Sequence, residues 1–456
     1  MIFEKIKSDG IAHNSYLIGA EGQAAVIDPR RDCDVYIDFC KQNHLRITSI
    51  FETHRNEDYV VGSVELADKT GAVIYHGHQL RFSYGKPVKE GNTFLFGSLE
   101  IEIIETPGHT DESISLVVKD RSDADIPLMV FTGDALFAGD VGRTDLYGEN
   151  QKRRLSKLLH KSIFSKILPL GDHVIVCPAH GKGSVCGGEI SDRELTTIGY
   201  EKKTNLALLK SEDEFIDYKI KEYHYRPPYF KKMEVYNKDG PPILKNIPII
   251  EPVSIAKLKT HISNGSQVVD IRSPLSFAGA HIPGSINIWR KGIPMFAGWV
   301  LNHEKPIIIV DDFNINLDEV IRFFIRLGYD KIVGYLSEGF SSWTKSAESV
   351  EKIDMWSVED LSKNIDNKNL YILDVREKNK VDEQGFIENS HNVFVGEVPI
   401  KLKTIPKNKQ ILVYCDTGFK TSIASSILKM HSYPKVANLL GGFAAWKNAG
   451  FLLEKR

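Results

Sequence analysis

The C-terminal half of the chain contains a repeat too long to be one unit of a solenoid. Residues 268–272 read Val-Val-Asp-Ile-Arg and residues 372–376 read Ile-Leu-Asp-Val-Arg. The apolar run at 306–311 aligns without gaps with residues 410–415. A repeat of about 100 residues implies two tandem copies of one domain. Apolar strands followed by helical patterns predict that each copy is an α/β domain with a buried parallel sheet.

The 456-residue chain is too long for one hydrophobic core. Turn-forming residues gather at 237–242, and before them short β-rich runs alternate with loops that carry His, Asp and Gly. We predict a mixed α/β domain over 1–235, a linker over 236–249, and the repeated domains over 250–350 and 351–456. In the first domain we predict strands at 15–18, 24–27, 47–51, 73–75, 99–104, 114–118, 128–131 and 174–176, and helices at 35–42 and 153–162.

The composition of the chain limits the classes of binding partner and the cellular compartment that we expect. The formal net charge is −2, with 58 basic and 60 acidic residues, so no electrostatic footprint for nucleic acid or for an anionic membrane is expected. No apolar run approaches the ~20 residues that span a bilayer, and the N-terminus lacks a signal-peptide pattern. The five cysteines are an odd number, which does not suggest a disulfide framework. We therefore expect a cytoplasmic protein with reduced thiols and a small-molecule partner.

Four loops of the first domain carry residues that bind metals. The loop at 53–59 reads Thr-His-Arg-Asn-Glu-Asp-Tyr and follows an isoleucine-rich run that ends at Ile50. Loops at the carboxyl edge of buried strands are where α/β folds place their chemistry. Three later loops present His109 in Thr-Pro-Gly-His, Asp134 in Thr-Gly-Asp, and His180 in Pro-Ala-His-Gly.

In this order the four loops resemble the metallo-β-lactamase superfamily, and the resemblance covers essentially residues 1–235. It implies an αββα sandwich and a metal held by His54, His109 and Asp134. Two histidines and one carboxylate form a facial triad that leaves three metal positions open, as expected of a mononuclear non-haem Fe(II) site that binds O2 and a thiolate together. We predict one Fe(II) per chain.

Two substitutions separate the 53–59 loop from the family pattern Thr-His-x-His-x-Asp-His. Asn56 stands at the second histidine and Tyr59 at the third. Zinc hydrolases of this fold draw a further ligand of the first metal from the position of Asn56, and ligands of a second metal from the positions of Tyr59, Asp58 and His180. The resemblance thus favours a single metal. We expect Asp58, His180 and Tyr59 to orient the ligands through hydrogen bonds, with direct coordination by Asp58 or His180 as the alternative.

Residues 139–145 and 180–187 resemble the Gly-Arg-Thr-Asp and His-Gly-x-Gly-Ser-x-Cys-Gly segments of the persulfide dioxygenase branch of that superfamily, and residues 197–202 add a third match. This implies oxidation of a low-molecular-weight thiol persulfide, such as that of glutathione or coenzyme A, by O2 to sulfite and free thiol. It also implies a homo-oligomer. We place Arg143 and Tyr200 at the substrate; a guanidinium could pair with a substrate carboxylate, or Arg143 could form a buried structural ion pair.

A second chemical site is predicted at Cys415, which ends an apolar strand and opens a loop that leads into a helical run at 422–430. Backbone N–H groups and the helix dipole stabilise a thiolate there, so we expect a low pKa and a stable persulfide. The loop resembles the rhodanese active-site loop, which implies sulfane-sulfur transfer to or from thiols, sulfite and thiosulfate. Gly418, Lys420 and Thr421 would bind the substrate, although a typical loop has Arg at the position of Lys420.

The first copy also resembles rhodanese but carries Asp311 at the cysteine position, and residues 312–316 offer neither a nucleophile nor a cation. We predict that it is a spacer or an interface domain. Cys186 is expected to be either a packed thiol or a transient sulfur carrier. Two other functions stay open: a zinc-dependent thioester hydrolase of the glyoxalase II type fused to a sulfurtransferase, and a sulfur-relay protein with a vestigial metal site.

Overall fold

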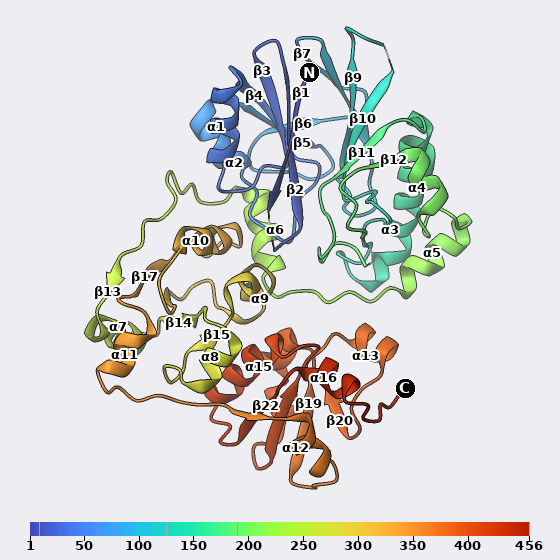
Figure 1. Ribbon diagram of the computed structural model, residues 1–456. Coiled ribbons are helices and arrows are strands. Elements are labelled where there is room, and N and C mark those ends of the chain that lie inside the picture. The colour runs from blue at the N-terminus through green and yellow to red at the C-terminus, as the bar shows by residue number, and fades with distance from the viewer. Residues whose placement is uncertain (9, 125, 189, 456) are drawn as a thin grey trace. The chain divides into compact units, whose positions relative to one another are not determined.

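The computed structural model describes residues 1–8, 10–124, 126–188 and 190–455, and the chain divides into two compact units (Figure 1). Unit 1 comprises Met1–Ile247 with the short segment Ile325–Gly328, and unit 2 comprises Pro248–Phe324 and Tyr329–Arg456. Within the described ranges, no helix combines the length and the apolar composition that crossing a membrane requires.

Unit 1 contains two six-stranded sheets, with strand orders β1-β2-β3-β4-β5-β6 and β12-β11-β10-β9-β8-β7. Both sheets are mixed, because β3 to β6 pair in parallel, as do β10 and β11, while the other neighbours are antiparallel. The strands are β1 Ile2–Ser8, β2 His13–Ala20, β3 Gln23–Ile27, β4 Arg46–Phe51, β5 Val73–Gly77, β6 Lys86–Val88, β7 Thr93–Phe96, β8 Leu99–Glu105, β9 Ile114–Asp120, β10 Pro127–Gly133, β11 Ile175–Pro178 and β12 Thr196–Thr197.

The side-chain alternation of the strands builds three layers of core in unit 1. In β2, Tyr16 and Ile18 face the apolar cluster between the two sheets, whereas Leu17 faces the cluster beneath the outer helices of the first sheet. Val117 and Val130 likewise face helices on the far side of the second sheet. The helices are α1 Asp34–Gln42, α2 Ser63–Thr70, α3 Glu149–Ser162, α4 Ile198–Thr204, α5 Glu212–Lys221 and α6 Phe230–Asp239, and the short helical segments Ile163–Ile167 and Leu168–Leu170 continue α3.

The order helix, sheet, sheet, helix confirms the predicted αββα sandwich. Each predicted strand has a counterpart, although the last one, β11, begins one residue later than expected. The predicted linker over 236–249 needs a correction at its start, because α6 continues to Asp239. The turn-forming residues that suggested a linker begin only at Gly240, which ends the helix with a φ of 95°.

Unit 2 contains two five-stranded sheets with the same topology, β13-β17-β16-β14-β15 and β18-β22-β21-β19-β20, and every strand pair is parallel. The strands are β13 Pro252–Val253, β14 Gln267–Asp270, β15 Ile286–Asn287, β16 Ile307–Val310, β17 Ile332–Leu336, β18 Asp354–Trp356, β19 Leu370–Asp374, β20 Ser390–Asn392, β21 Gln410–Tyr414 and β22 Val436–Leu439. The shared order confirms the prediction of two α/β copies with parallel sheets.

Helices connect the parallel strands in both copies, as parallel pairing requires. Those of the first copy are α7 Ile255–Ser263, α8 Pro274–Gly279, α9 Ile293–Val300, α10 Leu317–Arg326 and α11 Phe340–Lys345, with a short turn at Arg290–Gly292. Those of the second are α12 Val358–Lys363, α13 Lys378–Gln384, α14 Val398–Lys401, α15 Phe419–Met430 and α16 Gly442–Asn448, with short turns at Val395–Glu397 and Leu402–Thr404.

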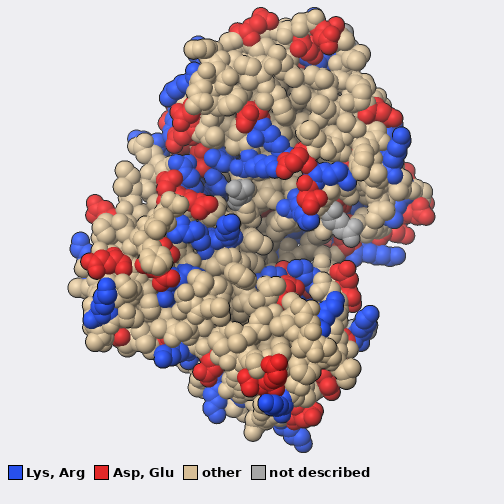
Figure 2. All heavy atoms as spheres, viewed as in Figure 1, with Lys and Arg blue, Asp and Glu red and all other residues tan. Residues whose placement is uncertain are grey.

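The surface carries both signs of charge. On the face that Figure 2 shows, basic side chains lie among acidic ones. The mixture of charges agrees with the nearly balanced formal net charge of −2.

Candidate metal centre and thiol loop

Three predicted ligands converge in unit 1 from loops that follow three different strands. His54 follows β4, His109 follows β8 and Asp134 follows β10. Asp134 Oδ2 lies 3.7 Å from His54 Nε2 and 3.5 Å from His109 Nε2. All three side chains are buried, and none of these atoms has a hydrogen-bond partner. Buried polar atoms are rarely left unpaired, so this group fits a bound cation.

A chain of hydrogen bonds through Thr53 and Asp28 orients the ring of His54 at its Nδ1 atom. Thr53 Oγ1 donates to Asp28 Oδ2 at 2.7 Å, and the Thr53 N–H donates to Asp28 Oδ1 at 2.8 Å. Because Thr53 Oγ1 gives its only proton to Asp28, it accepts from His54 Nδ1, 2.9 Å away. His54 Nε2 therefore presents its lone pair to the site. Burial lowers the pKa of His54 to about 4, which keeps the ring neutral, as a metal ligand must be.

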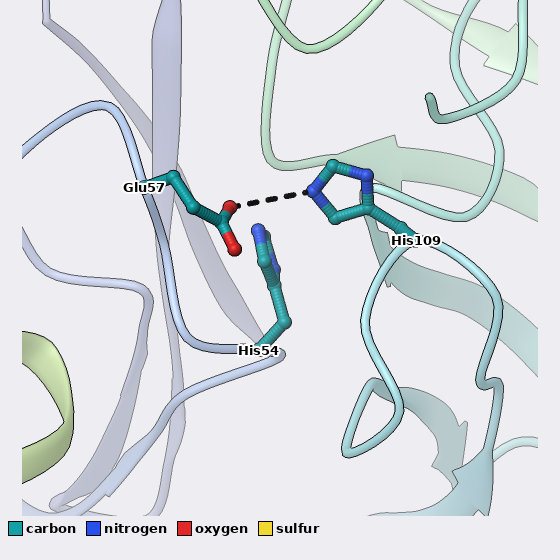
Figure 3. Close-up of side chains that lie close together, drawn as sticks. All are labelled: His54, Glu57 and His109. Carbon is teal, nitrogen blue, oxygen red and sulfur yellow. Dashed lines mark ion pairs between the residues drawn. The ribbon is translucent and has the colours of Figure 1, made fainter. Parts of the chain in front are cut away.

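His109 is oriented by the main chain. Its Nδ1 lies 3.0 Å from the carbonyl oxygen of Arg143, which can only accept, so Nδ1 carries the hydrogen and Nε2 is left facing the site. Nε2 lies 3.5 Å from Asp134 Oδ2. It also faces Glu57 Oε2 at 3.6 Å (Figure 3). Burial lowers the pKa of His109, but the Glu57 interaction and the Asp134 charge outweigh it, and the pKa is raised.

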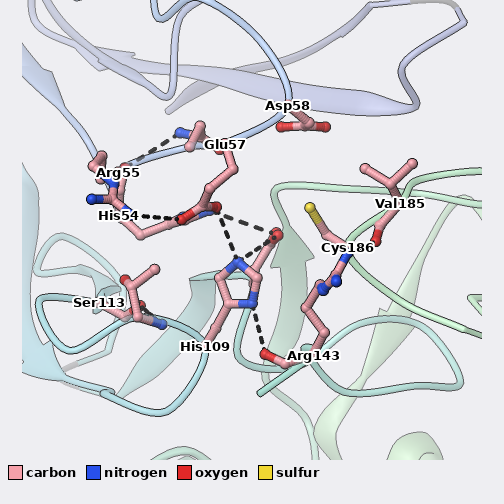
Figure 4. A network of polar contacts seen from close by, with 12 residues as sticks. His54, Arg55, Glu57, Asp58, His109, Ser113, Arg143, Val185 and Cys186 are labelled. Carbon is pink, nitrogen blue, oxygen red and sulfur yellow. Dashed lines mark hydrogen bonds and ion pairs between the residues drawn. The ribbon is translucent and has the colours of Figure 1, made fainter. Parts of the chain in front are cut away.

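Glu57 is the residue of this centre that sequence reasoning missed. It is fully buried, its Oε1 accepts from Arg55 Nη2 at 3.2 Å, and its Oε2 has no hydrogen-bond partner but lies near His109 (Figure 4). His54, Glu57 and His109 each offer a donor atom within 4.8 Å of the other two. The available signal was its place inside the metal loop, but a lone glutamate in a loop is more often exposed.

Asp58, His180 and Tyr59 lie beside the candidate ligands, where the family pattern places a second metal. His180 Nδ1 is hydrogen bonded to Asp134 Oδ1 at 2.7 Å. His180 Nε2 lies 2.9 Å from Asp58 Oδ2, an ion-pair distance without hydrogen-bond alignment. Burial lowers the pKa of His180, but the two carboxylates raise it well above its usual value. The Tyr59 ring packs on His13 with centroids 4.0 Å apart, and its buried hydroxyl has no partner.

Cys186 is also part of this buried group. Its Sγ lies within 4.8 Å of donor atoms of Asp58 and His180, and likewise of His109 and Asp134. Burial raises the pKa of this thiol well above its usual value. The sequence placed Cys186 in a loop without showing that this loop returns to the metal ligands.

Arg143 and Tyr200, both predicted at the substrate, differ in exposure: Arg143 is buried, whereas Tyr200 is exposed. Arg143 is buried and forms a bidentate ion pair with Asp145, at 2.6 and 2.9 Å, and its Nη1 donates to the carbonyl of Val185. This geometry favours the structural alternative for Arg143. Tyr200 lies on α4 with its ring covered by the guanidinium of Arg193 at 4.5 Å. A substrate role for either stays a prediction.

The Cys415 loop has the backbone arrangement that its sequence indicates. Cys415 follows β21, and the Gly418 N–H donates to its Sγ at 3.2 Å. Gly418 has a φ of 97° at the N-terminus of the 12-residue helix α15, and Thr421 Oγ1 donates to the Gly418 carbonyl at 2.6 Å. The expected low pKa is corrected, however: burial raises the pKa of the Cys415 thiol, and the N–H groups of Thr417, Gly418 and Thr421 offset this only in part.

Lys420 is engaged by acidic neighbours. Its Nζ lies 2.8 and 2.7 Å from the two carboxylate oxygens of Glu377, and 3.3 Å from Asp416 Oδ2. These carboxylates compensate the charge that would otherwise attract an oxyanion to the loop. The predicted role of Lys420 in substrate binding therefore depends on this ion pair opening.

The first copy contacts the active-site helix of the second. The Asn287 N–H donates to Ser426 Oγ of α15 at 3.3 Å, and the Trp289 ring lies 5.2 Å from that of Phe419. At the position equivalent to Cys415, Asp311 accepts from Arg290 at 3.2 Å, so this loop holds an ion pair in place of a nucleophile.

Comparisons with known proteins agree with this architecture. The chain matches the Metallo-beta-lactamase superfamily model over residues 8–180 and the Rhodanese-like domain model over residues 254–346 and 357–449. It is similar to the crystal structure of a metallo-beta-lactamase from Staphylococcus aureus subsp. aureus COL, with 32% identity and a TM-score of 0.66, covering 74% of this chain and 98% of that one.

Two characterised relatives match unit 1 at the same level. Persulfide dioxygenase ETHE1, mitochondrial, of Mus musculus is 28% identical over 214 residues, which are 44% of this chain and 74% of the relative. Hydroxyacylglutathione hydrolase GloC of Haemophilus influenzae is 28% identical over 207 residues, which are 41% of this chain and 87% of the relative.

Proposed function

Because the chain belongs to the metallo-β-lactamase superfamily and continues into two rhodanese-like domains, we propose that it is a persulfide dioxygenase joined to a sulfurtransferase. In the dioxygenase reaction, a thiol persulfide, O2 and water give the free thiol, sulfite and two protons. The sulfane sulfur loses the four electrons that reduce O2. The bound Fe(II) would supply open positions for the persulfide sulfur and for O2.

One observation carries the proposal: two imidazole nitrogens face a buried carboxylate oxygen, and none of these three atoms has a hydrogen-bond partner. His54, His109 and Asp134 would hold the metal. Thr53 and the Arg143 carbonyl orient the two rings, so the donors need not rearrange on binding. His180 bonds the second oxygen of Asp134 and thereby fixes the carboxylate. A set of two imidazole nitrogens and one carboxylate oxygen suits Fe(II).

Cys415 would carry the second activity. Its thiolate attacks the outer sulfur of a thiol persulfide, a new S–S bond forms on Cys415, and the old S–S bond breaks to release the thiolate of the carrier. The Cys415 persulfide then passes this sulfur to sulfite, giving thiosulfate and the free Cys415 thiolate. The Gly418 N–H, 3.2 Å from Sγ, stabilises negative charge on the cysteine. Sulfite from the first reaction is thus a substrate for the second.

The metal content and the oxygen requirement test the proposal together. Protein purified without oxygen is expected to contain about one iron per chain. It should consume O2 with glutathione persulfide or coenzyme A persulfide, and not with the corresponding thiols. Iron-replete protein that consumes no O2 with any persulfide would sink the proposal.

The runner-up is a zinc-dependent thioester hydrolase of the glyoxalase II type, since GloC matches unit 1 as well as ETHE1 does. The group Asp58, His180 and Cys186 favours it, because these donors could hold a second ion. That function predicts two zinc ions and hydrolysis of a glutathione thioester without O2. A sulfur-relay protein with a vestigial metal site predicts instead that neither iron nor zinc affects sulfur transfer.

A further inference from the structure

We propose that Glu57 is a fourth ligand of the metal, in place of the histidine that Asn56 replaces in the family pattern. The inference rests on the proposed function only in taking the site to hold one divalent ion. Asn56 uses its side-chain amide to donate to the His54 carbonyl at 3.3 Å. The next residue, Glu57, directs Oε2 toward His109 Nε2 (Figure 3).

In the Glu57 carboxylate, Oε1 accepts a hydrogen bond and Oε2 does not. Arg55 Nη2 donates to Oε1 at 3.2 Å, while the Arg55 N–H donates to Glu112 at 3.0 Å and so anchors the same stretch of main chain. Oε2 is buried without a hydrogen-bond partner. Leaving a buried carboxylate oxygen without a hydrogen bond is unfavourable, so a cation is expected to face it.

The spacing distinguishes a metal from a hydrogen bond. Glu57 Oε2 and Asp134 Oδ2 lie 3.6 and 3.5 Å from His109 Nε2, both longer than the roughly 3.2 Å limit of an N–H···O bond. Two ligands on one ion, each bound at about 2.1 Å, lie roughly 3.0 to 3.4 Å apart for right and tetrahedral angles. The observed separations are slightly longer than this range. An inward movement of each carboxylate toward His109 Nε2 would bring these two separations into the range for ligands of one ion.

A fourth ligand changes the chemistry that the centre can perform. The charges of Glu57 and Asp134 together neutralise a divalent ion, whereas Asp134 alone would leave one positive charge. With four protein ligands, a six-coordinate ion would have two open positions, enough for the persulfide sulfur and O2 without an additional water. Glu57 would thus favour oxygenation over hydrolysis.

Cobalt binding by variants tests the ligand directly, without any enzyme assay. Co²⁺ is added to metal-free full-length protein, its dissociation constant is measured by competition with a coloured chelator, and its visible absorption reports the ligand set. Glu57→Gln preserves the shape and removes the charge, and Glu57→Asp keeps the charge but shortens the reach. We expect Glu57→Gln to bind at least tenfold more weakly and with an altered spectrum, with Glu57→Asp between it and the unmodified protein.

Glu52→Gln is the matched control, because Glu52 is buried near the same loop but its oxygens accept from the Tyr84 hydroxyl at 3.0 Å. It should bind Co²⁺ within threefold of the unmodified protein. Circular dichroism of the metal-free variants checks that each one is folded. Should Glu57→Gln match the control in affinity and spectrum, Glu57 is not a ligand, while O2 consumption by the unmodified protein would still support the dioxygenase. Unmodified protein that binds no metal would overturn both.

Discussion

The side-chain amide of Asn237 donates to the carbonyl oxygen of Asn56 at 2.7 Å, so helix α6 holds the loop that carries the candidate ligands. The same amide nitrogen donates to the Tyr59 carbonyl at 2.7 Å, and its oxygen accepts from the Val61 N–H at 3.0 Å. One buried side chain thereby satisfies three main-chain groups of a loop without regular structure.

Replacing Asn237 with Ala should weaken both the fold and the metal site. The carbonyls of Asn56 and Tyr59 and the Val61 N–H would lose their partner in a buried region, which should cost about 2–4 kcal/mol of unfolding free energy. Urea unfolding measures this loss, and a Co²⁺ titration measures the metal affinity. The control is Asn43→Ala, which removes one partly exposed bond to the Phe39 carbonyl at the end of α1 and should cost less than about 1 kcal/mol. Equal losses in both variants would contradict the role of Asn237.

His109→Ala should abolish metal binding and persulfide-dependent O2 consumption. The substitution removes a ligand whose ring is already oriented by the Arg143 carbonyl, and it takes away the imidazole that lies 3.6 Å from Glu57 and 3.5 Å from Asp134. Iron content and sulfite formation are the measurements. His160→Ala, on the partly exposed face of α3, is the control and should retain both. Unchanged sulfite formation in His109→Ala would instead favour a vestigial metal site.

Cys415→Ser should separate the two activities. Serine is a far weaker nucleophile toward sulfur than a thiolate. The rate of thiosulfate formation by unit 2 should therefore fall at least a hundredfold, which corresponds to an activation barrier higher by about 3 kcal/mol. O2 consumption with a persulfide should stay within twofold, because the ligands lie in unit 1. An equal loss of O2 consumption would mean that Cys415 takes part in the dioxygenase reaction.

Sulfur transfer should quicken with rising pH, because burial raises the pKa of Cys415 and the thiolate is the minor form near neutrality. The rate should rise about tenfold per pH unit until the thiolate predominates. Glu377→Gln removes the main acidic partner of Lys420 and leaves Asp416 in place, so the less compensated ammonium should lower the pKa of Cys415 and move this profile to lower pH. Persulfide formation on Cys415, followed by mass spectrometry across pH, is the measurement.

The control for this profile is Glu383→Gln on α13, where the side chain is exposed. It should leave the pH dependence unchanged. A Glu377→Gln profile that coincides with the control, or moves to higher pH, would show that Lys420 does not act on the Cys415 thiol.

Restoring the family loop with Asn56→His and Tyr59→His should permit a second metal without improving persulfide oxidation. The new imidazole at position 59 would join Asp58, His180 and Cys186, which already cluster. Elemental analysis should show up to two ions per chain. A large gain in O2 consumption would mean that the two substitutions have been interpreted wrongly.

The fold class was predictable because its signals are local and repeated. Apolar runs such as 47–51 and 99–104 became β4 and β8, and the tandem copies in unit 2 share one strand order. The end of the first domain was less predictable. Residues 237–242 contain the turn formers that suggest a linker, yet Asn237 and Asp239 belong to α6, since a helix continues until Gly240 ends it. The contribution of Asn237 to the metal loop could not be inferred, because its three partners lie far away in the sequence.

By itself, the sequence determined which chemical groups the centres contain: the type of each residue and its place after a strand mark His54, His109, Asp134 and Cys415. Only the tertiary structure decided their state. Whether Glu57 faces solvent or His109, whether Arg143 is free or bound to Asp145, and whether the pKa of Cys415 falls or rises all depend on burial and on neighbours distant in the sequence. Composition and spacing describe the chain one segment at a time, whereas desolvation and ion pairing arise only when the sheets bring segments together.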